Sequence, residues 1–62
     1  MRYLVAYTER RKNAVRRVVT KGYSSRQYFN SIEEATERAY RLDTKKFKVE
    51  ILTENYEFVK EL

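Results

Sequence analysis

The sequence predicts a small α+β domain in which one helix packs on one face of a four-stranded antiparallel sheet, in the chain order β-β-α-β-β. Two observations carry this prediction: apolar and polar residues alternate near both ends of the chain, and an apolar stripe of helical period lies between them. A single helix on one sheet face is the simplest way to bury both apolar surfaces. A length of 62 residues predicts a single domain over 1–62.

The first third of the chain predicts a hairpin. An aromatic and β-branched run places three residues on one strand face, namely Tyr3, Val5 and Tyr7. The polar run 9–13 follows as the hairpin tip, where Asn13 can adopt a positive φ. Residues 14–21 are the expected returning strand, but their alternation breaks. Either a bulge near Arg16 and Arg17 or an arginine at the sheet rim with a buried stem would explain the break.

The middle of the chain predicts a turn followed by a capped helix. Gly22 is the single glycine, and the polar residues 23–27 after it favour a turn or an irregular connection. Ser31 and Glu34 have the spacing of a capping box, which predicts a helix from Ser31 to about Leu42. Its apolar stripe contains Ile32, Ala35, Ala39 and Leu42.

The last third of the chain predicts a second hairpin. Residues 47–51 alternate apolar and polar as a half-buried strand, with Leu52 as an exception on the outer face. A short turn over 53–55 leads to a final strand over 56–59. The helix is expected to pack on four strand residues: Val5, Val49, Ile51 and Phe58.

Six tyrosines and three phenylalanines are expected to supplement the small core of so short a chain. Tyr28 and Phe29 should pack under the sheet at the helix entrance, and Tyr28, Tyr40 and Tyr56 are expected to complete the core. The sequence leaves open which face Tyr3 and Tyr7 take, because their register is undetermined. A homodimer interface would be a further source of stability.

The residue inventory argues against an enzyme and against a bound metal or organic cofactor. Histidine and cysteine are absent, and there is no glycine-rich loop and no nucleophile motif. Glu33 and Glu37 lie one helical turn apart, but a pair on a solvent-facing helix is expected to be a solvated face. The N-terminus lacks the apolar region of a signal peptide, and no stretch is long enough to span a membrane. The expected localisation is therefore cytoplasmic.

Charge is distributed very unevenly along the chain. The first 28 residues contain eight bases and one acid, a balance of +7, whereas the remaining 34 contain six bases and eight acids. A strongly positive side favours encounters with a polyanion. The expected contact residues for nucleic acid or another partner are Arg10, Arg11, Lys12, Arg16, Arg17, Lys21, Tyr23 and Arg26. Tyr23 and Tyr28 would be able to stack on unpaired bases.

Two other interpretations of these residues remain open. Exposed Lys and Arg also protect strand edges from pairing with another chain, which requires no ligand. Alternatively, Tyr3, Tyr7 and Tyr23 with Arg16 or Arg17 would form a surface of the residue types enriched at protein interfaces, and this surface would fit an acidic protein groove.

The order of elements is also informative. A capped helix at Ser31–Ala35, a Phe-x-Val-x-Ile strand at 47–51 and a terminal Glu-Asn-Tyr-Glu-Phe-Val hairpin follow one another. This build resembles that of small phage-encoded accessory proteins, including some anti-CRISPR inhibitors. The resemblance covers most of the chain and is architectural, so it transfers no functional residue. It implies a protein that occupies a nucleic-acid-handling complex of the host.

Overall fold

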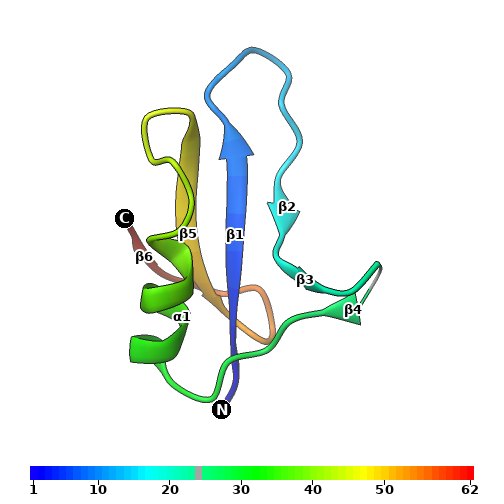
Figure 1. Cartoon of the computed structure of the whole chain (residues 1–62), viewed down its shortest axis with the longest axis vertical. Coiled ribbons are helices and arrows are strands. Elements are labelled where there is room, and N and C mark those ends of the chain that lie inside the picture. Colours follow the sequence, from blue (N-terminus) through cyan, green and yellow to red (C-terminus); the bar gives the residue numbers. More distant parts are fainter. Residues whose placement is uncertain (24) are drawn as a thin grey trace.

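The computed structural model describes residues 1–23 and 25–62, and Ser24, which falls in the predicted turn, lies outside the described residues. The elements are β1 (Tyr3–Glu9), β2 (Arg17–Val18), β3 (Thr20–Lys21), β4 (Ser25–Arg26), α1 (Ile32–Ala39), β5 (Phe47–Thr53) and β6 (Phe58–Glu61). Four strands form an antiparallel sheet in the order β2-β1-β5-β6, and β3 and β4 form a separate two-stranded ribbon (Figure 1). The predicted α+β fold with one helix on a four-stranded sheet is confirmed.

The long strands β1 and β5 form the centre of the sheet. They pair over seven positions, from Tyr3 opposite Thr53 to Glu9 opposite Phe47. Because both are flanked by further strands, their backbone hydrogen-bonding groups are largely satisfied within the sheet. Apolar residues on both of their faces are buried, because α1 covers one face and Val18 and Tyr28 pack against the other.

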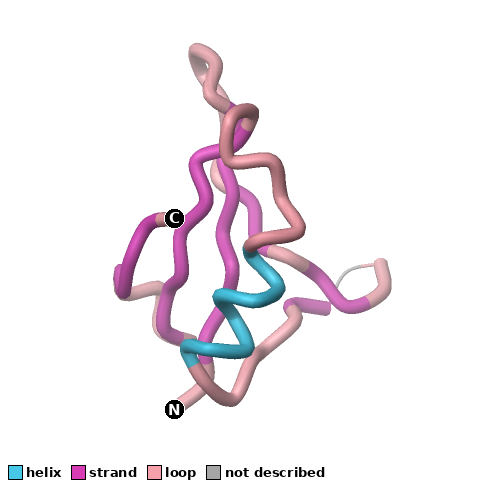
Figure 2. The backbone as a smooth tube through the Cα atoms, turned by 60° about the vertical axis from the view of Figure 1, so that its left-hand side comes forward, coloured by secondary structure: helices cyan, strands magenta, loops and turns pink. Residues whose placement is uncertain are grey.

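α1 lies across one face of β1 and β5 (Figure 2). Ser31 is its N-cap, with the Glu34 N–H donating to Ser31 Oγ at 3.1 Å, as predicted. Among the hydrogen bonds of the described residues, the reciprocal one from the Ser31 N–H to the Glu34 side chain is missing. The helix ends at Ala39 rather than Leu42, because the Arg41 and Leu42 N–H groups donate to carbonyls three residues back and tighten the last turn.

The helix-covered face contains most of the expected core. The buried cluster comprises Val5, Val19, Phe29, Ala35, Ala39, Val49 and Ile51, and the partly buried residues packed against it are Tyr3, Tyr7, Leu42, Phe47, Val59 and Leu62. Ile32, which is expected in the apolar stripe of the helix, is half-buried and does not belong to this cluster. The prediction that Phe58 packs under the helix is wrong, since Phe58 is 61% exposed. A register shift between Ile51 and Leu52 pairs Phe58 with Leu52, and Val59 packs against the cluster instead.

The returning strand is shorter than the expected 14–21. Only Arg17 and Val18 pair with β1, and Val15 is 74% exposed. Val19 interrupts the strand: its N–H donates to the Val5 carbonyl at 2.9 Å and its side chain is buried. The chain then leaves the sheet as β3, which pairs with β4 in the segment expected to be a turn. Asn13 has the predicted positive φ, at 63°.

A second buried cluster lies on the sheet face opposite α1. Leu4, Ala6 and Leu52 are buried there, with Val18 and Tyr28 packed against them. Leu52 points to the face opposite the helix, as expected. Its side chain is nevertheless buried, because other side chains cover this face. Tyr40 is 71% exposed and Tyr56 is 37% exposed, so the prediction that they complete the core is wrong.

Candidate functional site

Three arginines and two tyrosines form a continuous cluster beside the second buried face. The Arg2 guanidinium lies 4.0 Å from the centre of the Tyr28 ring. Arg16 and Arg26 lie 5.7 and 5.3 Å from the centre of the Tyr56 ring, within the range of cation–π attraction. Arg26 also lies near the Tyr28 hydroxyl, since this hydroxyl contributes to raising the pKa of Arg26, and the two groups are therefore neighbours. We call these five residues the Arg–Tyr ladder.

The ladder residues come from four separate parts of the chain. Arg2 precedes β1, Arg16 precedes β2, Arg26 belongs to β4 with Tyr28 just after it, and Tyr56 lies in the β5–β6 turn. The folding of the sheet brings these parts together. Because Tyr28 packs on the Leu4 cluster, the ladder is anchored to the core on one side and open to solvent on the other.

Tyr56 has an unusual backbone conformation. Its φ is 65°, in the left-handed region that bulky residues rarely adopt. The turn is held by Thr53, whose carbonyl accepts from the Tyr56 N–H at 2.8 Å and whose Oγ1 accepts from the Asn55 and Glu57 N–H groups, each at 3.2 Å. This network fixes the direction in which the Tyr56 side chain leaves the backbone.

The ladder has a net positive charge. Arg2 pairs with Glu54 at 3.4 Å. Among the described residues, no carboxylate lies within 4.0 Å of Arg16 or Arg26 in an ion pair. The contact with the Tyr28 hydroxyl raises the pKa of Arg26 above its ordinary value, and the charge interaction with Tyr56 adds to this effect. Both guanidinium groups are therefore available to an anionic ligand.

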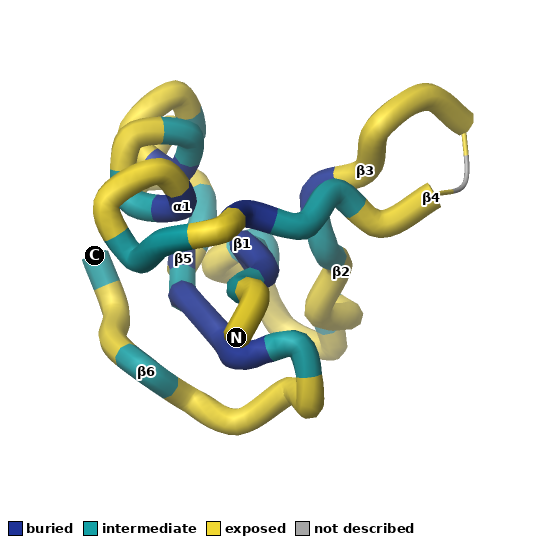
Figure 3. The backbone as a smooth tube through the Cα atoms, turned by 90° about the horizontal axis from the view of Figure 1, so that it is seen from below, coloured by how far each residue is buried: buried dark blue, intermediate teal, exposed yellow. Residues whose placement is uncertain are grey.

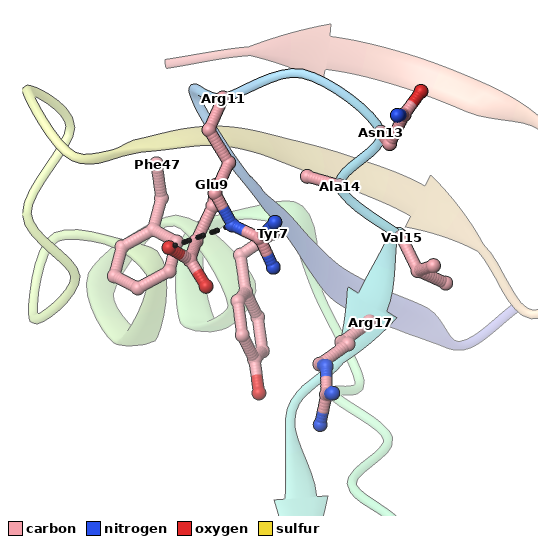
Figure 4. Close-up of a pocket in the computed structure, with 8 residues that line it drawn as sticks. All are labelled: Tyr7, Glu9, Arg11, Asn13, Ala14, Val15, Arg17 and Phe47. Atoms are coloured by element: carbon pink, nitrogen blue, oxygen red, sulfur yellow. Dashed lines mark hydrogen bonds and ion pairs between the residues drawn. The ribbon is translucent and has the colours of Figure 1, made fainter.

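The tip of the first hairpin forms a second basic region. Arg10, Arg11 and Lys12 are all exposed there. Arg10 Nε donates to the Thr44 carbonyl at 3.0 Å, and Arg11 pairs with Glu9 at 3.3 Å (Figure 4). These contacts are weak at exposed positions, so they leave the tip positively charged and open to solvent.

A small pocket of about 90 Å³ lies beside this tip. It is lined by Tyr7, Glu9, Arg11, Asn13, Ala14, Val15, Arg17 and Phe47. Figure 4 shows the Arg17 side chain extending in the same direction as the Tyr7 ring. Tyr7 belongs to the helix-side cluster, and Arg17 is its partner in the β1–β2 register. Arg16 and Arg17 therefore serve different surfaces, because adjacent side chains of a strand point to opposite faces.

The β3–β4 ribbon carries the remaining predicted residues. It extends from the body of the molecule, and the residues near its tip are exposed (Figure 3). Lys21 and Tyr23 lie at this tip. The Tyr23 side chain is fully exposed and does not pack on the core. Gly22 between them has a φ of 77°, which suits the tight reversal.

The predicted site residues are thus all exposed, but they are divided among four places: the hairpin tip, the pocket beside it with Arg17, the ladder and the ribbon. The sequence did not identify Arg2 and Tyr56 as members of the site, and it gave Tyr28 both a core and a stacking role. Arg2 and Tyr56 lie 54 positions apart in the chain, and no local pattern links them.

The described residues contain no group of three or more His, Cys, Asp or Glu that could hold a metal ion. The described part of the chain also contains no helix that is long and apolar enough to cross a membrane. The chemistry that the site does offer is cationic and aromatic. No protein-family model matches this chain, and no curated protein or solved structure is detectably similar to it.

Proposed function

We propose that this protein is a non-catalytic, cytoplasmic nucleic-acid-binding protein whose basic side contacts the phosphate backbone of nucleic acid or of a nucleoprotein complex. One observation carries the proposal. Residues 10–26 contain seven bases and no acid, and all seven bases are exposed. They are Arg10, Arg11, Lys12, Arg16, Arg17, Lys21 and Arg26. Solubility alone does not require so many bases without compensating acids.

The sheet order gives this charge a direction. β2 and the β3–β4 ribbon lie on one side of the molecule, whereas β6 lies on the other (Figures 1 and 3). α1 and β6 together contain four glutamates, one arginine and one lysine, and Figure 1 shows both on the same side of β1. The charge of the molecule therefore changes from positive on the side of β2 and the ribbon to mildly negative on the side of α1 and β6. Such a dipole would orient the protein with its basic side toward a polyanion.

The proposal is tested by titrating DNA and RNA with the purified protein at increasing salt. Contacts of about six phosphates predict an affinity loss of about 10³-fold or more between about 50 and 200 mM salt. The triple variant Arg10→Glu, Arg11→Glu, Lys12→Glu should remain folded, because its residues are exposed, and should lose most of this binding.

A second triple variant controls for net charge. Arg38→Glu, Arg41→Glu, Lys60→Glu makes the same change in charge on α1, just after it and on β6, away from the hairpin tip, and it should retain binding through the tip. Equal loss in both triple variants would show that total charge, rather than the basic side, governs the interaction. Absence of any binding by the unmodified protein at low salt would contradict the proposed function.

The ladder also supports a second candidate function, that of a phage-type inhibitor that docks on an acidic surface of a host protein complex. Tyr and Arg are the residue types most enriched among the energetically dominant residues of protein interfaces. A pull-down from lysate with and without nuclease separates the two functions. A protein partner retained after nuclease treatment, at a salt concentration that releases nucleic acid, would favour the inhibitor.

A further inference from the structure

We propose that the Arg–Tyr ladder binds unpaired bases, so that the preferred ligand is single-stranded nucleic acid. This inference rests on the proposed function and names the ligand of its site. The argument depends on three features of the ladder: its exposed rings, the backbone conformation of Tyr56 and the position of its guanidinium groups.

The rings are available on a sheet face that no helix covers. Tyr56 is 37% exposed, and Tyr28 is half-buried on the Leu4 cluster. Phe58, which is 61% exposed, lies opposite Leu52 in the β5–β6 register and so shares its face. Three aromatic side chains, Tyr28, Tyr56 and Phe58, are thus partly exposed to water on this side of the molecule. Base stacking would use these rings, and it accepts any base because each base has a π face.

The backbone at Tyr56 indicates that the position of this ring matters. A φ of 65° favours Gly or Asn, and Asn55 is the adjacent residue, yet the tyrosine occupies the left-handed position. The three hydrogen bonds to Thr53 hold the turn in this form. Such conformations persist where the surrounding structure enforces them, and they are concentrated at binding sites.

The guanidinium groups complete the site. Arg16, just before β2, and Arg26, in β4, converge on one ring, and neither forms an ion pair among the described residues. A planar guanidinium can stack on a base and can donate to a phosphate in a forked geometry. The ladder therefore offers aromatic rings for stacking and guanidinium groups for phosphates next to each other.

A duplex would leave most of these groups unused. Its bases are stacked inside the helix, so a protein surface meets phosphates and groove edges instead. The hairpin tip and the β3–β4 ribbon can reach such phosphates, but Tyr28 is half-buried against the Leu4 cluster, and Tyr56 lies in the β5–β6 turn beside Arg16 and Arg26. The ladder should therefore contribute to single-strand binding and add little to duplex binding.

The test compares oligonucleotides of about twelve nucleotides, within the range of known single-strand sites, by fluorescence anisotropy. Single-stranded DNA, single-stranded RNA and a duplex with the same number of phosphates are titrated with the unmodified protein and with Tyr56→Asn. This variant removes the ring and suits the positive φ, so the turn should be retained. Tyr56→Phe keeps the ring. Tyr40→Asn is the matched control, because it removes an exposed tyrosine from the end of the helix.

Tyr56→Asn is expected to weaken single-strand binding by about 5- to 150-fold, the equivalent of one stacked base, and to change duplex binding by less than about twofold. Tyr56→Phe and Tyr40→Asn should bind as the unmodified protein does. If Tyr56→Asn fails to fold, Tyr28→Leu replaces it, since leucine keeps an apolar cover on Leu4 while removing a ring. A preference between the two single strands identifies the ligand as DNA or RNA.

Two results would overturn the inference. Equal affinity for single strand and duplex, with no effect of Tyr56→Asn, would remove the ladder from the site while leaving the proposed function in place. Absence of binding to all three oligonucleotides at low salt would overturn the proposed function and this inference together.

Discussion

The two faces of this sheet are closed in different ways. On one face, the small residues Ala35 and Ala39 let α1 approach β1 and β5 closely, and the cover is a regular apolar element. On the other face, Leu4 and Leu52 are equally buried, but Tyr28 and neighbouring loop segments cover them, with arginines stacked on the exposed rings. The first cover is specialised for stability. The second combines an apolar underside with a polar, cationic outer side.

This difference shows how a very short chain can cover an apolar sheet face with residues whose cationic and aromatic outer side stays exposed. A chain of 62 residues cannot supply a second helix for the other face. Arginine stems and phenol rings can shield apolar residues while their polar ends remain in water. Changes on the helix face should therefore affect folding alone, whereas changes in the ladder should affect binding more than folding.

The largest effect is expected on the helix face. Ala39→Glu places a carboxylate at a fully buried position without a partner, which costs several kcal/mol and exceeds the margin of so small a domain. Circular dichroism should show an unfolded chain at room temperature. Tyr40→Glu, at the exposed neighbouring position, should melt as the unmodified protein does. A folded Ala39→Glu variant would mean that the helix packs through a different face.

A comparison of Ile51→Ala with Leu52→Ala tests whether the two faces are equally well packed. These adjacent residues of β5 point to opposite faces, and both are buried. Each substitution is expected to reduce the free energy of unfolding by about 2–5 kcal/mol. Urea titration measures both. A much smaller loss for Leu52→Ala would show that the ladder face is loosely packed and that its cover is not part of the core.

An intermediate effect is expected at the start of the helix. Ser31→Ala removes the oxygen that accepts from the Glu34 N–H and should lower stability by about 1 kcal/mol. Because the Ser31 hydroxyl is hydrogen-bonded to the Glu34 N–H of the helix and not to a ladder residue, nucleic-acid affinity of the folded protein should remain unchanged. Thermal melting and anisotropy together check both expectations, and Ser31→Asp, which can also cap the helix, should restore the melting temperature. A loss of affinity in the folded Ser31→Ala variant would contradict the separation of the two faces.

The smallest effect on stability is expected at Tyr56. Tyr56→Gly relieves the unfavourable positive φ, which favours folding by about 1 kcal/mol, but it also removes the ring from its contacts with Arg16 and Arg26. These contributions oppose each other, so the free energy of unfolding should change by less than about 1 kcal/mol. Urea titration measures this change. A loss of several kcal/mol would show that Tyr56 is mainly a core residue.

Local patterns account for the parts of the fold that the sequence predicts well. The alternation in 3–7 and 47–51 predicts the two central strands, and Ser31 with Glu34 predicts the start of the helix, because each pattern depends on residues a few positions apart. The prediction failed for Val15, Phe58 and the end of the helix. In these places, pairing with a distant strand or the tightening of a helix end overrides the local pattern.

The candidate site shows the same division. The excess of positive charge in the first 28 residues is evident from the sequence, and so is the exposure of Arg10, Arg11 and Lys12 at a hairpin tip. The alternation cannot place Arg16 and Arg17 on their faces, because Arg16 precedes β2 and the strand is interrupted at Val19. The register with β1 resolves this: Arg17 pairs with Tyr7, and Arg16 lies near Tyr56.

The sequence by itself determined the α+β class, the helix cap, the absence of Cys and His and the charge asymmetry, because each follows from composition or from neighbouring residues. Only the tertiary structure decided that Arg2, Arg16, Arg26, Tyr28 and Tyr56 form one ladder. These residues meet through strand pairing, the bend at Val19 and the positive φ of Tyr56. Each of these depends on contacts between segments far apart in the chain, and such contacts form only when the whole sheet folds.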